Sequence, residues 1–113
     1  MAKVKIVPSL FREIKKRFGG EGHKIIDLME TLEVNPHKGK ALGNVGGIII
    51  KEIRYKSFRF YFIIEGFKLR CFDKEKLVDL LIKFVRMSDK KSQQKIINEI
   101  RNVLQKIGSQ GFD

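Results

Sequence analysis

Residues 48–65 read IIIKEIRYKSFRFYFIIE, and this stretch decides the fold. β-Branched and aromatic residues, which favour extended backbone, fill both of its halves. Every second residue from Phe58 to Ile64 is apolar, and an apolar period of two is typical of a β-strand. The stretch therefore predicts two strands, Ile48–Tyr55 and Phe58–Glu65, joined by a short turn at Lys56-Ser57.

A two-residue turn also predicts which residues of the two strands lie opposite each other. The expected pairs are Tyr55 with Phe58, Arg54 with Arg59, Ile53 with Phe60, and Glu52 with Tyr61. The other face then carries two opposed arginines, a repulsion of up to about 1 kcal/mol. Either both splay into water with Glu52 as their partner, or both grip an anion such as phosphate, which arginine binds bidentately. Tyr61 shares that face and could stack on a base.

The residues around this hairpin predict helices and further strands. A strand over Lys3–Val7 precedes an αα-hairpin, with apolar residues at helical spacing from about Ser9 to Phe18 and from Glu21 to Val34. Later elements are a loop at His37–Gly47 before the paired strands, an extended segment at Phe67–Phe72, a polar turn at Asp73–Lys76, a strand at Leu77–Arg86, and a last helix that starts within Ser88–Lys91 and ends near Ile107.

This order of elements predicts an α+β fold: an N-terminal strand and a helical hairpin, then an antiparallel β-meander and a C-terminal helix. We expect the helices to pack on one face of the sheet, over the phenylalanine stripe, so that the arginine face stays open. With 113 residues the chain is long enough for one domain, 1–113, and too short for two cores. A hydrophobic share of 42% supplies that core and argues against disorder.

The net charge of +11 bears most directly on function. Like charges repel in a compact chain, and a polyanion relieves this repulsion by exchanging its counterions for protein cations. Residues 21–34 carry a net charge of −3, whereas residues 1–20 and residues 35–59 carry +5 each. The sequence therefore favours a basic face that binds nucleic acid, with an acidic protein or an anionic membrane surface as the alternative.

Several other chemistries find little support in the sequence. The single cysteine, Cys71, excludes an internal disulfide and a cysteine zinc site. His23 and His37 lack neighbouring ligand residues, so we expect neither a metal nor another cofactor. The apolar runs fall well short of the roughly 20 residues that cross a membrane, and the N-terminus lacks a secretory signal pattern. We therefore expect a cytoplasmic protein with no membrane partner.

Several landmarks, in order along the chain, resemble the RelE/ParE toxin superfamily. A helix ends at Asn35-Pro36, a loop of lysine, glycine and leucine follows at residues 38–43, and a glycine precedes the next strand. The hairpin at residues 53–61, IRYKSFRFY, resembles the family's spacing of two arginines and a tyrosine. The last strand ends in Arg86, and residues 90–94, KKSQQ, are similar to the phage-derived HigB-like branch.

The resemblance implies a toxin of a type II toxin–antitoxin pair. Ribonuclease members cut messenger RNA in the ribosomal A site without a metal, by attack of the RNA 2′-hydroxyl on the adjacent phosphorus. By position, Arg59 matches the arginine that stabilises the transition state, Arg86 matches a basic residue at the last strand's end, and Arg54 matches a flanking RNA contact. The implied partners are messenger RNA on the ribosome and an acidic antitoxin. Further nucleic-acid-binding candidates are Lys51, Lys56, Tyr61, Lys90 and Lys91.

The chain departs from the ribonuclease members at three positions. Ile50 and Glu52 stand where those members carry lysines, and Ser92 lies near the position of a family tyrosine. Two alternatives therefore stand beside a metal-independent messenger RNA endonuclease. One is a non-catalytic module of the same fold that binds RNA or DNA, and the other is a ParE-like toxin directed at a topoisomerase.

Overall fold

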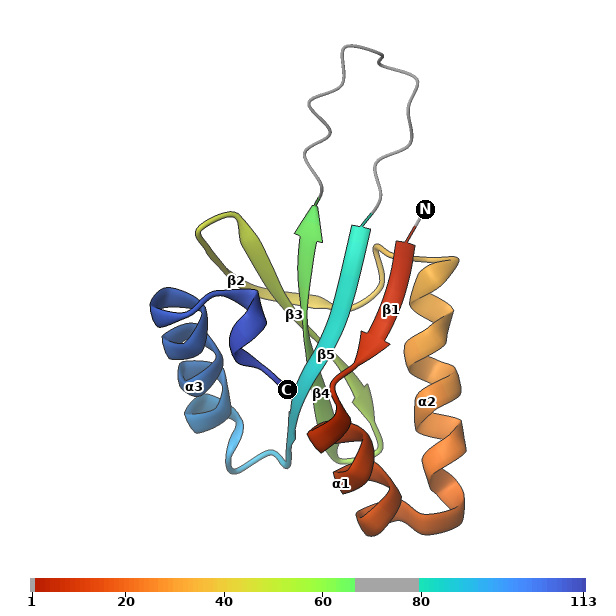
Figure 1. Ribbon diagram of the computed structural model, residues 1–113. Coiled ribbons are helices and arrows are strands. Elements are labelled where there is room, and N and C mark those ends of the chain that lie inside the picture. The colour runs from red at the N-terminus through yellow and green to blue at the C-terminus, as the bar shows by residue number, and fades with distance from the viewer. Residues whose placement is uncertain (1, 67–79) are drawn as a thin grey trace.

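The computed structural model describes residues 2–66 and 80–113, which fold around a mixed β-sheet (Figure 1). Its strands are β1 (Ala2–Ile6), β2 (Lys40–Val45), β3 (Ile48–Tyr55), β4 (Phe58–Gly66) and β5 (Leu80–Ser88), in the spatial order β1-β5-β4-β3-β2. Neighbouring strands are antiparallel, except that β1 runs parallel to β5. The predicted α+β fold is confirmed, while the elements predicted for residues 67–76 and the first residues of the last strand lie outside the described residues.

The helices of the described residues are α1 (Pro8–Phe18), α2 (Gly22–Glu30) and α3 (Gln93–Lys106), with short 3-10 turns between and after them. As predicted, a glycine pair joins α1 to α2. Gly19 has a φ of +54°, a backbone conformation that glycine adopts without a steric penalty. No helix of residues 2–66 and 80–113 is both long and apolar enough to cross a membrane.

The pairing of β3 with β4 follows the predicted register. Tyr55 lies opposite Phe58, Arg54 opposite Arg59, and the pairs continue to Ile49 and Ile64. Lys56 closes the turn with a φ of +55°, which is uncommon for a residue with a side chain. The alternation of apolar residues in β4 therefore specified the register, although the turn has an unfavoured sequence.

The region before β3 is a strand, whereas the sequence predicted a loop. Residues 40–45, KALGNV, form β2 at the edge of the sheet and pair with β3. An irregularity between Ala41 and Gly43 interrupts this pairing, as expected for a bulge at an edge strand. This strand could not be predicted from its own residues, because it contains glycine and shows only a weak apolar alternation. It forms because its backbone pairs with β3 rather than because its residues prefer an extended conformation.

The first two helices cover the phenylalanine face of the sheet. The ring of Phe18 in α1 meets those of Phe58 and Phe60 on β4, at centroid distances of 5.1 and 6.2 Å. The buried hydrophobic residues of these two helices are Leu10, Ile14, Ile25 and Met29.

The third helix covers the opposite face, so the helices are divided between the two faces rather than packed on one. Arg86 on β5 lies in register with Tyr61, and its Nε atom is 2.9 Å from Glu99 Oε1 on α3. Farther along α3, Arg101 donates a hydrogen bond to the Leu42 carbonyl oxygen at 3.2 Å. In Figure 1, α3 lies on one side of the sheet and α1 and α2 lie on the other. The arginine face is therefore partly covered.

Candidate nucleic-acid interface

The three arginines singled out in the sequence lie on one face of three adjacent strands. Arg54 on β3 is directly opposite Arg59 on β4. Tyr61, two residues after Arg59 and thus on the same face, is opposite Arg86 on β5. The sheet therefore brings Arg54, Arg59 and Arg86 onto a common surface.

The carboxylate of Glu52, rather than solvent water, compensates the positive charges of the two opposed arginines. Its Oε2 atom lies 3.6 Å from Arg54 Nε and 3.9 Å from Arg59 Nε. The side chains of Glu52 and Arg59 are 1% and 8% exposed, whereas that of Arg54 is 56% exposed. The expectation of two open guanidinium groups is therefore wrong for Arg59, which lies inside the protein against a buried carboxylate.

The buried pair of Glu52 and Arg59 is incompletely satisfied. Glu52 Oε1 and Arg59 Nε have no hydrogen-bond partner among the described residues. A buried charge that loses its counterion is strongly destabilising, because neither water nor another charge compensates it. Electrostatic attraction consequently holds the pair together, and the burial of the Arg59 guanidinium depends on the carboxylate of Glu52.

Tyr61 lies fully within the core, so the prediction that it lies on an open face is wrong. Its hydroxyl group shares a 2.7 Å hydrogen bond with Ser88 Oγ. Burial raises the pKa of this phenol above its ordinary value. The ring has no exposed surface on which a base could stack.

Arg86 connects the sheet to α3. Besides the pair with Glu99, its Nη1 atom donates a 2.7 Å hydrogen bond to the carbonyl oxygen of Val85. The guanidinium carbon lies 5.0 Å from the ring centroid of Phe112, a distance at which a cation is attracted to an aromatic face. The side chain of Arg86 is 28% exposed, and its contacts mainly link β5 to α3 and to the segment after α3.

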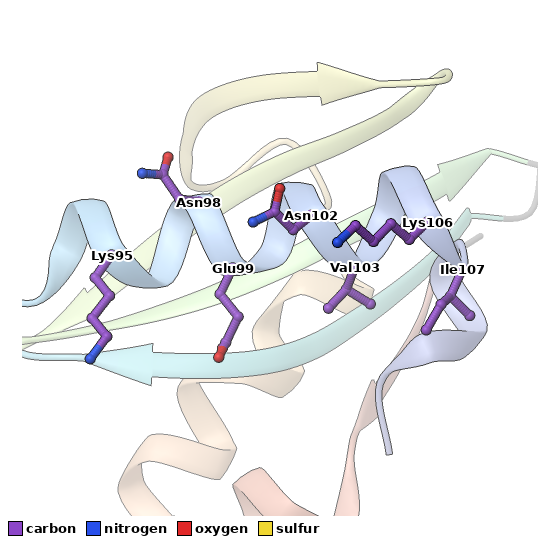
Figure 2. A pocket seen from close by; sticks show the side chains of 7 residues that line it. All are labelled: Lys95, Asn98, Glu99, Asn102, Val103, Lys106 and Ile107. Atoms are coloured by element: carbon purple, nitrogen blue, oxygen red, sulfur yellow. The ribbon is translucent and has the colours of Figure 1, made fainter.

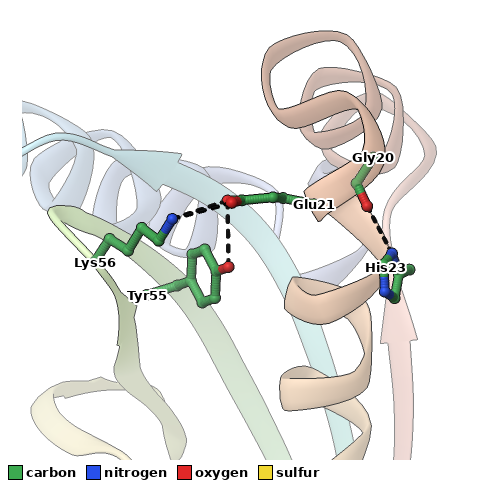
Figure 3. Close-up of polar contacts among 5 residues, drawn as sticks. All are labelled: Gly20, Glu21, His23, Tyr55 and Lys56. Carbon is green, nitrogen blue, oxygen red and sulfur yellow. Dashed lines mark hydrogen bonds and ion pairs between the residues drawn. The ribbon is translucent and has the colours of Figure 1, made fainter.

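Two of the candidate lysines make contacts within the protein. Lys51 donates a hydrogen bond to the carbonyl oxygen of His37 at 3.0 Å. Lys56 lies 3.1 Å from the carboxylate of Glu21, which also accepts a bond from the Tyr55 hydroxyl (Figure 3). Hydrogen bonding to Lys56 lowers the pKa of the Glu21 carboxyl, and the same contact raises the pKa of Lys56. This exposed ion pair ties the β3–β4 turn to the α1–α2 connection.

His23 lies in the first turn of α2, and His37 lies in a turn before β2. His23 Nδ1 is 2.6 Å from the carbonyl oxygen of Gly20, at the start of α2 (Figure 3). His37 is exposed and lies before β2. The described part of the chain contains no group of three or more histidine, cysteine, aspartate or glutamate residues that could hold a metal ion.

The remaining candidates, Lys90 and Lys91, are exposed in the loop between β5 and α3. Asp89 fixes this loop, because its Oδ1 accepts the backbone N–H of Ser92 at 2.8 Å. That hydrogen bond lowers the pKa of the Asp89 carboxyl. The two ammonium groups thus stand at the beginning of α3, and neither has an ion-pair partner among the described residues.

The outer surface of α3 continues this polar region, and its residues after Lys91 are not among the candidates predicted from the sequence. A shallow hollow of about 430 Å³ lies along the helix, and Figure 2 shows Asn98 and Asn102 on one edge of the helix, with Lys95 and Glu99 on the other edge. The residues lining the hollow are Lys95, Asn98, Glu99, Asn102, Val103, Lys106 and Ile107. The signal in the sequence was the recurrence of amides every three or four residues, which places them on one face of a helix.

Comparisons of this chain with models of protein families, with curated proteins and with solved structures found no match. The arrangement itself combines exposed lysines around α3 with a sheet face whose arginines are held by carboxylates. Such a surface can bind a polyanion electrostatically, because exposed cations release the counterions of the polyanion.

Proposed function

We propose that this protein is a nucleic-acid-binding module that does not cleave its ligand. The carrying observation is the contrast between its exposed lysines and its engaged arginines. Lys90, Lys91 and Lys95 are exposed and form no ion pair within the described residues, whereas Arg59 and Arg86 are each paired with a carboxylate. Exposed cations suffice for binding phosphates, which requires no particular geometry.

Cleavage has stricter requirements than binding. Negative charge that develops on the phosphoryl oxygens in the transition state must meet preorganised cations at hydrogen-bond distance. Arg59 faces Glu52 in the interior, and Arg86 faces Glu99. A phosphate would have to displace both carboxylates and reach the buried guanidinium of Arg59, which favours binding without strand scission.

The test is binding of fluorescently labelled RNA and DNA oligonucleotides, single- and double-stranded, followed by electrophoresis of the recovered strands. We expect binding at low salt, and strands that remain intact. Lys90→Gln combined with Lys91→Gln should lower the affinity by at least about tenfold, because two phosphate contacts are lost.

The matched control is Lys24→Gln combined with Lys38→Gln. It removes the same charge from the α2 side of the molecule, where Lys24 is exposed and Lys38 contacts Thr31, and should change the affinity much less. Absence of binding to every oligonucleotide at low salt would exclude the proposed function. Equal losses in both variants would show that binding follows total charge rather than the surface near α3.

A second candidate is metal-free messenger RNA cleavage by a toxin of the RelE/ParE type. It is favoured by one observation, the common face shared by Arg54, Arg59 and Arg86. Expression should then arrest growth and fragment transcripts, and Arg59→Met in a Glu52→Leu background should relieve both, since that pair of changes removes both buried charges together. Intact transcripts during expression of the unaltered protein would reject this candidate, and arrest with altered plasmid supercoiling would point to a topoisomerase target.

A further inference from the structure

The solvent-facing side of α3 has an unusual composition. Its buried side is apolar and consists of Ile97, Ile100 and Leu104. Its exposed side carries four amides, at Gln94, Asn98, Asn102 and Gln105. At 100° per residue, these four positions fall within a sector about 80° wide, so they form one stripe along the helix. Gln94 Nε2 donates to Asn98 Oδ1 at 3.1 Å, which links two members of the stripe.

Positive charge flanks this stripe. Lys90 and Lys91 precede the helix, and Lys95 and Lys106 lie beside the amides near its two ends. Glu99 is the one acidic residue within α3, and its carboxylate is bonded to an arginine of β5. The exposed stripe is therefore neutral at its centre and cationic near its ends and along one flank, which complements base edges that are bordered by phosphates.

The length of α3 and the chemistry of its exposed side chains favour duplex DNA over RNA as the ligand. An α-helix of 14 residues is about 21 Å long, and the major groove of B-form DNA admits a helix, whereas that of A-form RNA is too deep and narrow. Asparagine and glutamine bond bidentately to the major-groove edge of adenine. Recognition of single-stranded RNA relies on aromatic rings that stack on bases, and no aromatic side chain belongs to α3.

We propose that α3 is a recognition helix that enters the major groove of double-stranded DNA. Asn98 and Asn102 contact base edges, and Lys90, Lys91, Lys95 and Lys106 contact the neighbouring phosphates. This inference rests on the proposed function and narrows its ligand. The location of α3 supports it, because the helix lies on the sheet face opposite α1 and α2 (Figure 1) and the side chains of Asn98 and Asn102 are exposed.

The test is enrichment of sequences from a pool of random DNA duplexes. The unaltered protein should enrich a short motif that contains adenine. Asn98→Ala combined with Asn102→Ala should lose at least about tenfold in preference for that motif, since each bidentate contact discriminates by about fivefold or more. Both residues are exposed, so the variant should keep its thermal unfolding midpoint.

A second measurement locates the contact in the groove. Replacing the selected adenines with 7-deazaadenine removes a major-groove acceptor and should weaken binding by the unaltered protein but not by the double variant. Binding of duplexes without any enriched motif, or a motif preference that survives the double substitution, would overturn the recognition helix and leave the proposed function standing. Stronger binding to single-stranded RNA than to any duplex would overturn it as well. Failure to bind every oligonucleotide would instead reject the proposed function itself.

Discussion

Replacing Glu52 with alanine is expected to lower the free energy of unfolding by about 3–5 kcal/mol, the range found when one partner of a buried ion pair is removed. The side chain of Arg59 is 8% exposed, and Glu52 is its ion-pair partner among the described residues. Without that carboxylate, the guanidinium stays in the interior with no compensating charge. Urea denaturation followed by circular dichroism measures the difference directly.

Two comparison variants make this result specific. Glu99→Ala removes a carboxylate that also pairs with an arginine, but one that is 49% exposed, so the expected loss is below about 1 kcal/mol. Glu52→Leu combined with Arg59→Met removes both buried charges and should regain most of the stability lost in the single variant. A Glu52→Ala protein as stable as the unaltered chain would show that Arg59 reaches water or another partner.

The hairpin at the centre of the fold could be predicted because its information is local. A two-residue turn links the strands, and the register that it sets places the pairs of Tyr55 with Phe58 and Ile53 with Phe60 on one face. The parallel pairing of β1 with β5 could not be predicted in this way. It joins residues 2–6 to residues 80–84, and no local pattern specifies a contact across that separation.

The candidate site was misjudged for a related reason. The polar identities of Arg59 and Tyr61 suggested an exposed face, yet Ile63 and Ile50 on that face are buried as well. A central strand covered on both sides becomes a nearly continuous apolar run, and Phe58–Ile64 is such a run with one arginine in it. Whether this face of the sheet is exposed or covered depends on the position of α3. The sequence does not specify that position, because a helix at the end of the chain can pack against either face.

Binding to nucleic acid is expected to fall by about 10³-fold between 50 and 200 mM salt if about six phosphates are contacted. Each neutralised phosphate of duplex DNA adds about −0.9 to the slope of log affinity against log salt concentration. Lys90→Gln combined with Lys91→Gln should therefore reduce the steepness of that slope by about two. Fluorescence anisotropy at a series of salt concentrations gives both values.

The dependence of affinity on salt concentration distinguishes base contacts from phosphate contacts at the α3 surface. Asn98 and Asn102 carry no charge, so their replacement should alter sequence preference and leave the slope unchanged, whereas the lysine variant should weaken binding to all sequences alike. Lys24→Gln combined with Lys38→Gln should also keep the original slope, because these residues lie on the α2 side. An affinity that is independent of salt would contradict a phosphate-binding surface, since counterion release is unavoidable when lysines neutralise phosphates.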